Sequence, residues 1–180
     1  MKAVISGIGP DQPGIVAAIS DILFRYGCNI EDSTMTLLAD EFAVILLISA
    51  ENLPMDALKT EFSNLEERLD LLLVIKPVPP SAETAKMGAK KPEPYMISVA
   101  GNDRTGITWR VSQLLAELGI NILDLNAQII PGDEGPVYIM MVEVELPPSI
   151  TEDAARTPLR ALAAELGVEI QLRPLEAVAL

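Results

Sequence analysis

An internal duplication constrains this chain more than any other feature of its sequence. Residues 5–32 align without a gap with residues 97–124, and twelve of the twenty-eight aligned positions are identical. The identical positions include turn residues as well as apolar ones, namely Ile5, Ser6, Gly9, Asp11, Gly14, Ile15, Ser20, Leu23, Gly27, Asn29, Ile30 and Asp32. Such self-similarity predicts two copies of one structural unit.

The chain has 180 residues, which suits two domains of about 90 residues each. The segment between the two copies is rich in proline, alanine and lysine and shows no apolar period, so we expect an extended linker. The predicted organisation is a first domain at 1–77, a linker at 78–93, a second domain at 94–175 and a tail at 176–180.

Each half shows the pattern strand, helix, strand, strand, helix, strand. The helical spacing of a buried stripe falls on Ile15, Ile19, Ile22, Leu23 and Tyr26, and again on Ile107, Val111, Leu114, Leu115 and Leu118. The βαββαβ order predicts an α+β fold of two ferredoxin-like domains, each a four-stranded antiparallel sheet with both helices on one face. Parallel pairing through right-handed crossovers is expected for the strands that each helix joins.

The third strand of each half is apolar on both faces. Residues 42–48 and 137–142 do not alternate between apolar and polar side chains, as a strand with one wet face would. We therefore expect the face opposite the helices to be covered by the other domain or by a second subunit. Trp109 is expected on the outward side of its helix, as a contact anchor.

The loop between the first strand and the first helix carries the candidate chemistry. It contains Gly9, Asp11 and Gly14, and the second half repeats them as Gly101, Asp103 and Gly106. Glycine lets backbone amides approach a ligand, although a tight turn would explain it equally. Free amides at a helix start attract an anion such as a carboxylate. The aspartate either caps the helix or accepts a hydrogen bond from the ammonium group of a ligand.

A second repeated turn precedes the second strand of each half. Gly27 and Gly119 stand where a left-handed helix cap belongs, and Asn29 and Asn121 open the strand. We expect this edge to lie close to the first loop, where an asparagine offers donors and an acceptor; a purely structural turn is the alternative. Amide donors beside side-chain oxygens predict a site for a zwitterion, that is, a small amino acid such as glycine or serine. We expect no cofactor and no metal.

Several classes of catalyst are disfavoured by composition. The chain has no histidine, the commonest general base, and a single cysteine, Cys28, which we expect to be a small buried hydrophobe and not a reactive thiol. The glycine spacing of the first loop does not match a dinucleotide-binding fingerprint, and the lysine of a phosphate-binding loop is missing. We therefore predict no catalytic residues; an enzyme that uses only carboxylates is a minor alternative.

The charge balance disfavours nucleic acid as a direct ligand. The chain carries 26 acidic and 13 basic residues, for a formal net charge of −13, whereas a nucleic-acid binder needs a basic surface. Only 4% of the residues are aromatic, which also disfavours an RNA-binding ferredoxin-like domain. No apolar run approaches the ~20 residues that span a bilayer, so we expect a cytoplasmic protein without membrane contact.

The motif Gly-x-Asp-x-Pro-Gly-Ile at 9–15, followed by a helix and by Gly-x-Asn-Ile at 27–30, resembles the ACT domain family of regulatory amino-acid-binding modules. Two such units without a catalytic domain resemble the glycine cleavage system transcriptional repressor group. The resemblance implies side-by-side domains that bind small ligands between the first loop and helix of one unit and an adjacent unit. The facing residues would be Gly9, Asp11 and Asn29, with Gly101, Asp103 and Asn121 in the second half.

The family's common Asp-Arg-Pro-Gly is intact in neither half. Gln12 stands in place of arginine in the first half, and Thr105 in place of proline in the second, so the two sites are not expected to be equal in affinity. Our leading hypothesis is a non-catalytic, amino-acid-binding regulatory protein, oligomeric and acting on transcription through a protein partner. The alternative is an assembly module that works without a ligand.

Overall fold

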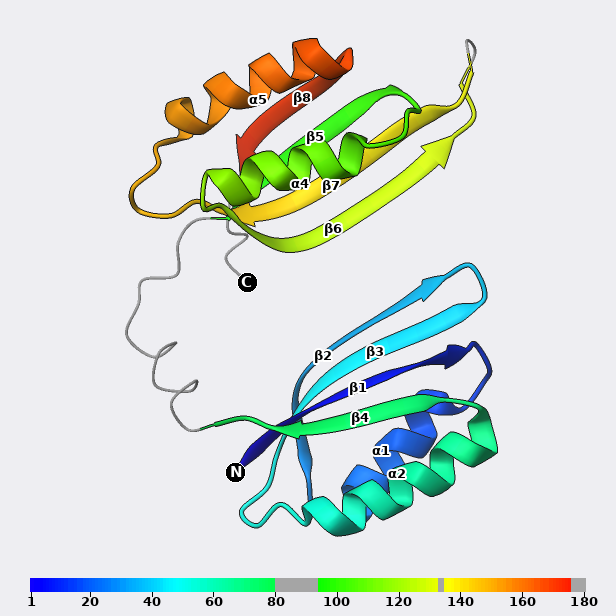
Figure 1. Cartoon of the computed structure of the whole chain (residues 1–180). Helices are drawn as coiled ribbons and strands as arrows, with labels where there is room; N and C mark the ends of the chain where they lie inside the picture. Colours follow the sequence, from blue (N-terminus) through cyan, green and yellow to red (C-terminus); the bar gives the residue numbers. More distant parts are fainter. Residues whose placement is uncertain (80–93, 133–134, 176–180) are drawn as a thin grey trace. The chain divides into compact units, whose positions relative to one another are not determined.

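The computed structural model describes residues 1–79, 94–132 and 135–175. These residues form two compact units, one that precedes residues 80–93 in the sequence and one that follows them (Figure 1). The predicted linker and the predicted tail fall largely or wholly outside the described residues. The first strand of the second unit begins at Pro94, and the last strand of the first unit ends at Pro77.

Both units have the order βαββαβ. The first contains β1 (Lys2–Pro10), α1 (Ile15–Arg25), β2 (Asn29–Leu38), β3 (Glu41–Ser49), α2 (Met55–Leu69) and β4 (Leu72–Pro77). The second contains β5 (Pro94–Asn102), α4 (Ile107–Glu117), β6 (Asn121–Ile130), β7 (Val137–Glu145), α5 (Glu152–Leu166) and β8 (Val168–Pro174). The predicted ferredoxin-like plan is confirmed in each half.

All strand pairs in both sheets are antiparallel. The strand order is β2-β3-β1-β4 in the first sheet and β6-β7-β5-β8 in the second. The expectation of parallel pairing is wrong. Strands joined by a helix do run in the same direction, but a third strand lies between them and forms the hydrogen bonds on both sides.

Each sheet buries one face under its two helices (Figure 1). Four of the five residues of the predicted stripe, Ile15, Ile19, Ile22 and Leu23, are buried in α1, whereas Tyr26 caps the helix and is partly buried. These side chains pack on alternate residues of β1 and β3, and the second unit repeats the arrangement with its own cluster. Among the described residues no polar or charged side chain is buried, so apolar burial alone forms both cores.

Left-handed glycines end the first helix of each unit, as predicted. Gly27 and Gly119 both have a φ of 66°. The amide of Cys28 then donates to the carbonyl of Leu23 at 2.9 Å, and Ile120 donates to Leu115 at the same distance. These bonds satisfy carbonyls that the helix end would otherwise leave without a partner.

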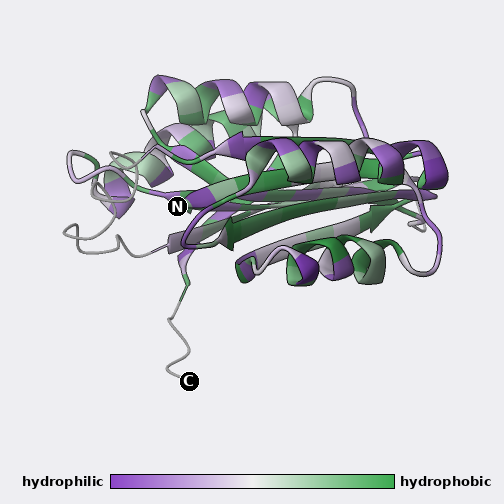
Figure 2. Cartoon of the chain, turned by 90° about the horizontal axis from the view of Figure 1, so that it is seen from below, coloured by the Kyte–Doolittle hydropathy of each residue, from purple (hydrophilic) through white to green (hydrophobic). Residues whose placement is uncertain are grey.

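The face of the first sheet opposite its helices keeps large apolar side chains exposed. They are Ile8, Ile45, Leu72 and Val74, which are between 39% and 61% exposed. In Figure 2 the strand ribbons are largely green, whereas the helices alternate between green and purple. The helices of the unit cover only one face of β3, so the cover expected on its other face stays a prediction. Trp109 is 63% exposed, as expected.

The segment between α2 and β4 comes very close to a glycine of β1. A Cβ atom added to Gly9 would lie 2.6 Å from the backbone carbonyl oxygen of Asp70 and 2.8 Å from Cδ2 of Leu71. We expect Gly9→Ala to destabilise the first unit by about 1–3 kcal/mol, because backbone atoms must move to make room. Urea unfolding would measure the change. Ser6→Ala, at an exposed position of the same strand, should stay within about 0.5 kcal/mol; equal costs would contradict the steric explanation.

Candidate functional site

The loops that precede α1 and α4 share one backbone geometry. Gly14 and Gly106 have φ values of 100° and 98°, a left-handed conformation that favours glycine. A Cβ atom at either position would meet no other group of the described structure within 4 Å. The conformation of the turn, and not crowding, therefore requires glycine at these two positions.

The first amides of α1 and α4 are available to a ligand. The first helical hydrogen bonds run from the amide of Ala18 to the carbonyl of Gly14 and from Arg110 to Gly106. The amides of residues 15–17 and 107–109 precede these bonds, and no described side chain caps either helix. The capping role considered for Asp11 and Asp103 is therefore not seen in this structure. Uncapped amides and the helix dipole together favour an anion here.

Backbone and side-chain bonds fix the loop to its surroundings. The amide of Asp11 donates to the carbonyl of Asp40 at 2.9 Å, and that of Asp103 donates to Pro136 at 3.1 Å. Nε2 of Gln12 donates to the carbonyl oxygen of Leu69 at 2.8 Å, at the end of α2. Both aspartate side chains are exposed, so their carboxylates are free to meet a ligand from solvent.

Arg104 takes the place of Gln12 in the second unit and reaches the same region. Its Nη1 lies 3.9 Å from where a Cβ atom of Gly167 would stand, at the end of α5. Gln12 and Arg104 therefore both extend from the loop toward the C-terminal end of the second helix of their unit, α2 or α5. In the first unit, the glutamine that stands in place of arginine holds the loop by its bond to the Leu69 carbonyl.

An apolar hollow of about 100 Å³ lies between α1 and β2. Val16, in the first turn of α1, lines it together with Ile19, Ser20, Ile30, Ser33, Met35, Val44 and Leu46. Because β2 is the edge strand of the sheet, its side chains on this face extend past the helix, and Met35 is 58% exposed. The hollow adjoins the free amides of α1 and is large enough for a small aliphatic side chain.

The corresponding part of the second unit is more polar. Thr108, which aligns with Val16, shares a hydrogen bond of 2.7 Å between its hydroxyl and that of Tyr138 on β7. The Tyr138 hydroxyl also donates to the sulfur of Met140 at 3.4 Å. A hydroxyl group can both donate and accept, so this pair offers a polar group to a ligand whichever of the two is the donor in their shared bond. The first unit has Val16 and Phe42 at these positions and lacks both hydroxyls.

Asn29 lies far from the loop of its own unit. The register pairs Gly9 with Phe42, whereas Asn29 pairs with Ser49, seven residues further along β3. Seven residues of strand span about 23 Å. Asn121 pairs with Glu145, again at the end of the sheet away from Gly101. The expectation that this strand edge lies close to the first loop is therefore wrong within a unit. The two glycines and the aspartate predicted in each half lie together in the loop, whereas the asparagine does not.

The remaining chemistry of the described residues is sparse. They contain no group of three or more histidine, cysteine or acidic side chains that could hold a metal ion. Burial raises the pKa of the Cys28 thiol, which disfavours a reactive thiolate, as predicted. No helix in the described ranges is long and apolar enough to cross a membrane.

Comparison with known proteins identifies the repeated unit. The family model for the ACT domain matches residues 2–76 and again residues 93–173. The chain belongs to the ACT domain family. Its two ACT domains coincide with the two structural units, and the loop and helix start described above recur in both.

Two of the similar proteins match nearly the whole chain, and a third matches one half of it. The glycine cleavage system transcriptional repressor of Escherichia coli is 27% identical over 168 residues, which are 92% of this chain and 86% of that protein. A crystal structure of an unknown protein from Galdieria sulphuraria is 26% identical, with a TM-score of 0.81 over 97% of this chain and 98% of that one. A single-domain UPF0237 protein of Methanopyrus kandleri is 36% identical over 77 residues, 42% of this chain and 86% of that protein.

The anchoring role of Gln12 can be measured separately from ligand binding. Gln12→Ala removes the bond to the Leu69 carbonyl, and we expect the first ACT domain to lose about 0.5–1.5 kcal/mol of stability. Chemical denaturation of the full chain would report the loss. Asn126→Ala, which removes an exposed amide that donates to Asp124 at 2.7 Å, is the matched control and should cost less. No difference between the two would show that the Gln12 bond does not hold the loop.

Proposed function

We propose that this chain is a non-catalytic regulatory protein that binds a small amino acid at the start of α1 and of α4. The observation that carries the proposal is the uncapped helix start beside an exposed aspartate, which occurs in both halves. The carboxylate of the ligand accepts from the free amides, and its ammonium group donates to Asp11 or Asp103. Gly9, Gly14, Gly101 and Gly106 shape the backbone that presents these groups.

The site supports binding better than catalysis. It offers backbone donors, a carboxylate and an apolar wall, but the described residues add no nucleophile with an adjacent base and no metal-binding cluster. A domain that only binds can still transmit a signal if the ligand favours one of its conformations. We assign Asn29 and Asn121 no contact with a ligand at the loop of their own unit.

The regulatory role is proposed from the relative in Escherichia coli, whose name makes it a transcriptional repressor. The net charge of −13 opposes direct contact with the phosphates of DNA. We therefore propose that any effect on transcription passes through a protein partner. If the amino acid binds the partner-bound conformation more tightly or more weakly than the free one, its binding changes the affinity for the partner by the same factor.

Isothermal titration of the full chain with glycine, serine, alanine and leucine tests amino-acid binding. We expect Asp11→Asn together with Asp103→Asn to weaken the tightest ligand about tenfold, because the charged partner of the ammonium group is lost. Asp56→Asn together with Asp153→Asn removes an equal charge from the exposed first turns of α2 and α5 and should leave the affinity unchanged. Silence with every amino acid would overturn the proposal.

The two sites should differ in selectivity because the second has the hydroxyls of Thr108 and Tyr138 where the first has Val16 and Phe42. We expect Thr108→Val with Tyr138→Phe to reduce the preference of the second site for serine over alanine by about tenfold. Titration of each ligand against the double variant would measure this preference. Thr157→Val removes a hydroxyl from the exposed face of α5 and serves as the control. An unchanged ratio would show that the hydroxyl pair does not contact the ligand side chain.

The exposed apolar face of the first sheet favours a second candidate function, assembly without a ligand. Ile45 stands in the middle of that face, so Ile45→Asp should lower the oligomeric mass by light scattering if the face is an interface. Substitution of Asp11, Asn29, Asp103 and Asn121 separates the two functions. If the chain only assembles and binds no ligand, its oligomeric mass should be unchanged by these substitutions at every amino-acid concentration.

A further inference from the structure

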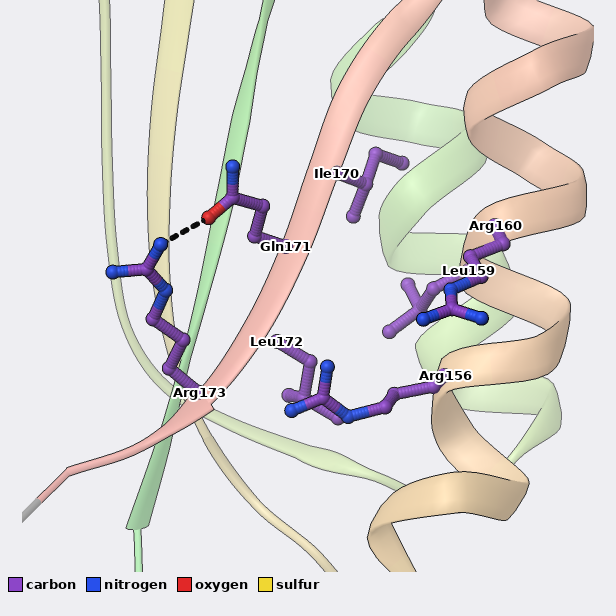
Figure 3. A pocket seen from close by; sticks show the side chains of 7 residues that line it. All are labelled: Arg156, Leu159, Arg160, Ile170, Gln171, Leu172 and Arg173. Carbon is purple, nitrogen blue, oxygen red and sulfur yellow. Dashed lines mark hydrogen bonds between the residues drawn. The ribbon is translucent and has the colours of Figure 1, made fainter.

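Three arginines gather at the open edge of the second sheet. Among the described strands β8 pairs with β5 alone, which leaves the outward backbone groups of one edge without a strand partner. A hollow of about 300 Å³ lies along this edge, between β8 and α5. It is lined by Arg156, Leu159, Arg160, Ile170, Gln171, Leu172 and Arg173 (Figure 3).

The arginines stand on both faces of the edge. Leu172 is buried in the core, so its neighbour Arg173 points to the opposite face of the sheet. In Figure 3, Arg156 and Arg160 extend from α5 on one side of β8, whereas Arg173 and Gln171 lie on its other side. A strand that paired with β8 would send its own side chains alternately toward these two sets.

The positive charge of this edge is only partly compensated. Arg156 forms an ion pair with Glu152, and Arg173 donates to Oε1 of Gln171, a neutral group, at 2.6 Å. Arg160 is exposed and makes no ion pair within the described part of the chain. Three neighbouring arginines are unexpected in a protein of net charge −13, because acidic side chains are twice as numerous as basic ones.

The fold itself does not require these arginines. The first unit has the same helix and edge strand, and there the corresponding residues are Lys59, Ser63, Val74 and Lys76. The first unit therefore carries two lysines where the second carries three arginines and a glutamine. Arginine differs from lysine in its planar, forked donors, which match a carboxylate in two-point contact.

We infer that the open edge of β8 binds an extended acidic segment of a protein partner, which adds a fifth strand to the second sheet. Main-chain hydrogen bonds supply part of the affinity, and carboxylates that alternate between the two faces meet Arg156 and Arg160 on one side and Arg173 on the other. Charged side chains at an edge discourage unspecific pairing, and here they admit only a strand of opposite charge. A second copy of β8 would bring like charges together.

The surface is separate from the loop proposed to bind amino acids, so its test does not depend on that function. A fluorescent twelve-residue peptide that repeats Glu-Glu-Val-Thr carries carboxylates on both faces of a strand. Its binding to the full chain is followed by anisotropy at low salt. We expect R156Q/R160Q/R173Q to weaken binding about tenfold or more, and salt to weaken it as well.

Two controls isolate the arginines and the strand pairing. K59Q/R68Q/K76Q removes the same charge from the first unit and should leave the affinity within about twofold. A peptide with proline in place of each threonine keeps its charge but cannot pair fully with an edge, so it should bind much more weakly. In the complex, the amides of residues 169–173 should gain protection from hydrogen exchange.

Three outcomes would overturn the inference. The first is that the acidic peptide does not bind at all, or that the arginine variant binds it as well as the unmodified chain does. The second is equal binding of the proline-containing peptide, which would show that the edge attracts anions without adding a strand. The third is concentration-dependent protection of residues 169–173 in the protein alone, which would show that a second copy occupies the edge.

Discussion

The close contact between the end of the first strand and the residues that lead into the last strand determines the geometry of each half. At Gly9 there is no room for a Cβ atom against Asp70 and Leu71, and at Gly101 there is none against Val168. Because these backbones touch, the loop that follows leaves the sheet at one defined point beside the end of the second helix. The bonds of Gln12 and of the Asp11 amide then hold it there, and the left-handed glycine directs the chain into the helix with its first amides free.

The same backbone supports two different environments. Both halves present amides and an aspartate, but the first adds Val16 and Phe42 whereas the second adds the hydrogen-bonded hydroxyls of Thr108 and Tyr138. Duplication preserves the geometry because the turns and the core depend on it. The wall of the site is free to change, because a hydroxyl at the surface costs little when water or a neighbouring hydroxyl can satisfy it.

Charge is distributed unequally over the molecule. Acidic residues outnumber basic ones two to one, yet three arginines stand at one sheet edge of the second unit. An exposed ion pair contributes little to stability, so these arginines are better explained by what they attract than by what they stabilise. The proposed amino-acid site and the proposed partner edge lie on different elements of the unit, which would allow a ligand at α4 and a partner at β8 to bind at the same time.

The sequence by itself determined the two repeats, the order of strands and helices in each half, and the glycines at the turns, namely Gly14, Gly27, Gly106 and Gly119, because periodicity and turns are local properties of the chain. The tertiary structure alone decided that Asn29 lies about 23 Å along the sheet from Gly9, that Gln12 binds the end of α2 and that Thr108 meets Tyr138. Each of these depends on the direction and register of strands distant in sequence. A local pattern shows which residues form a strand, but only hydrogen bonding between strands fixes which of their ends meet.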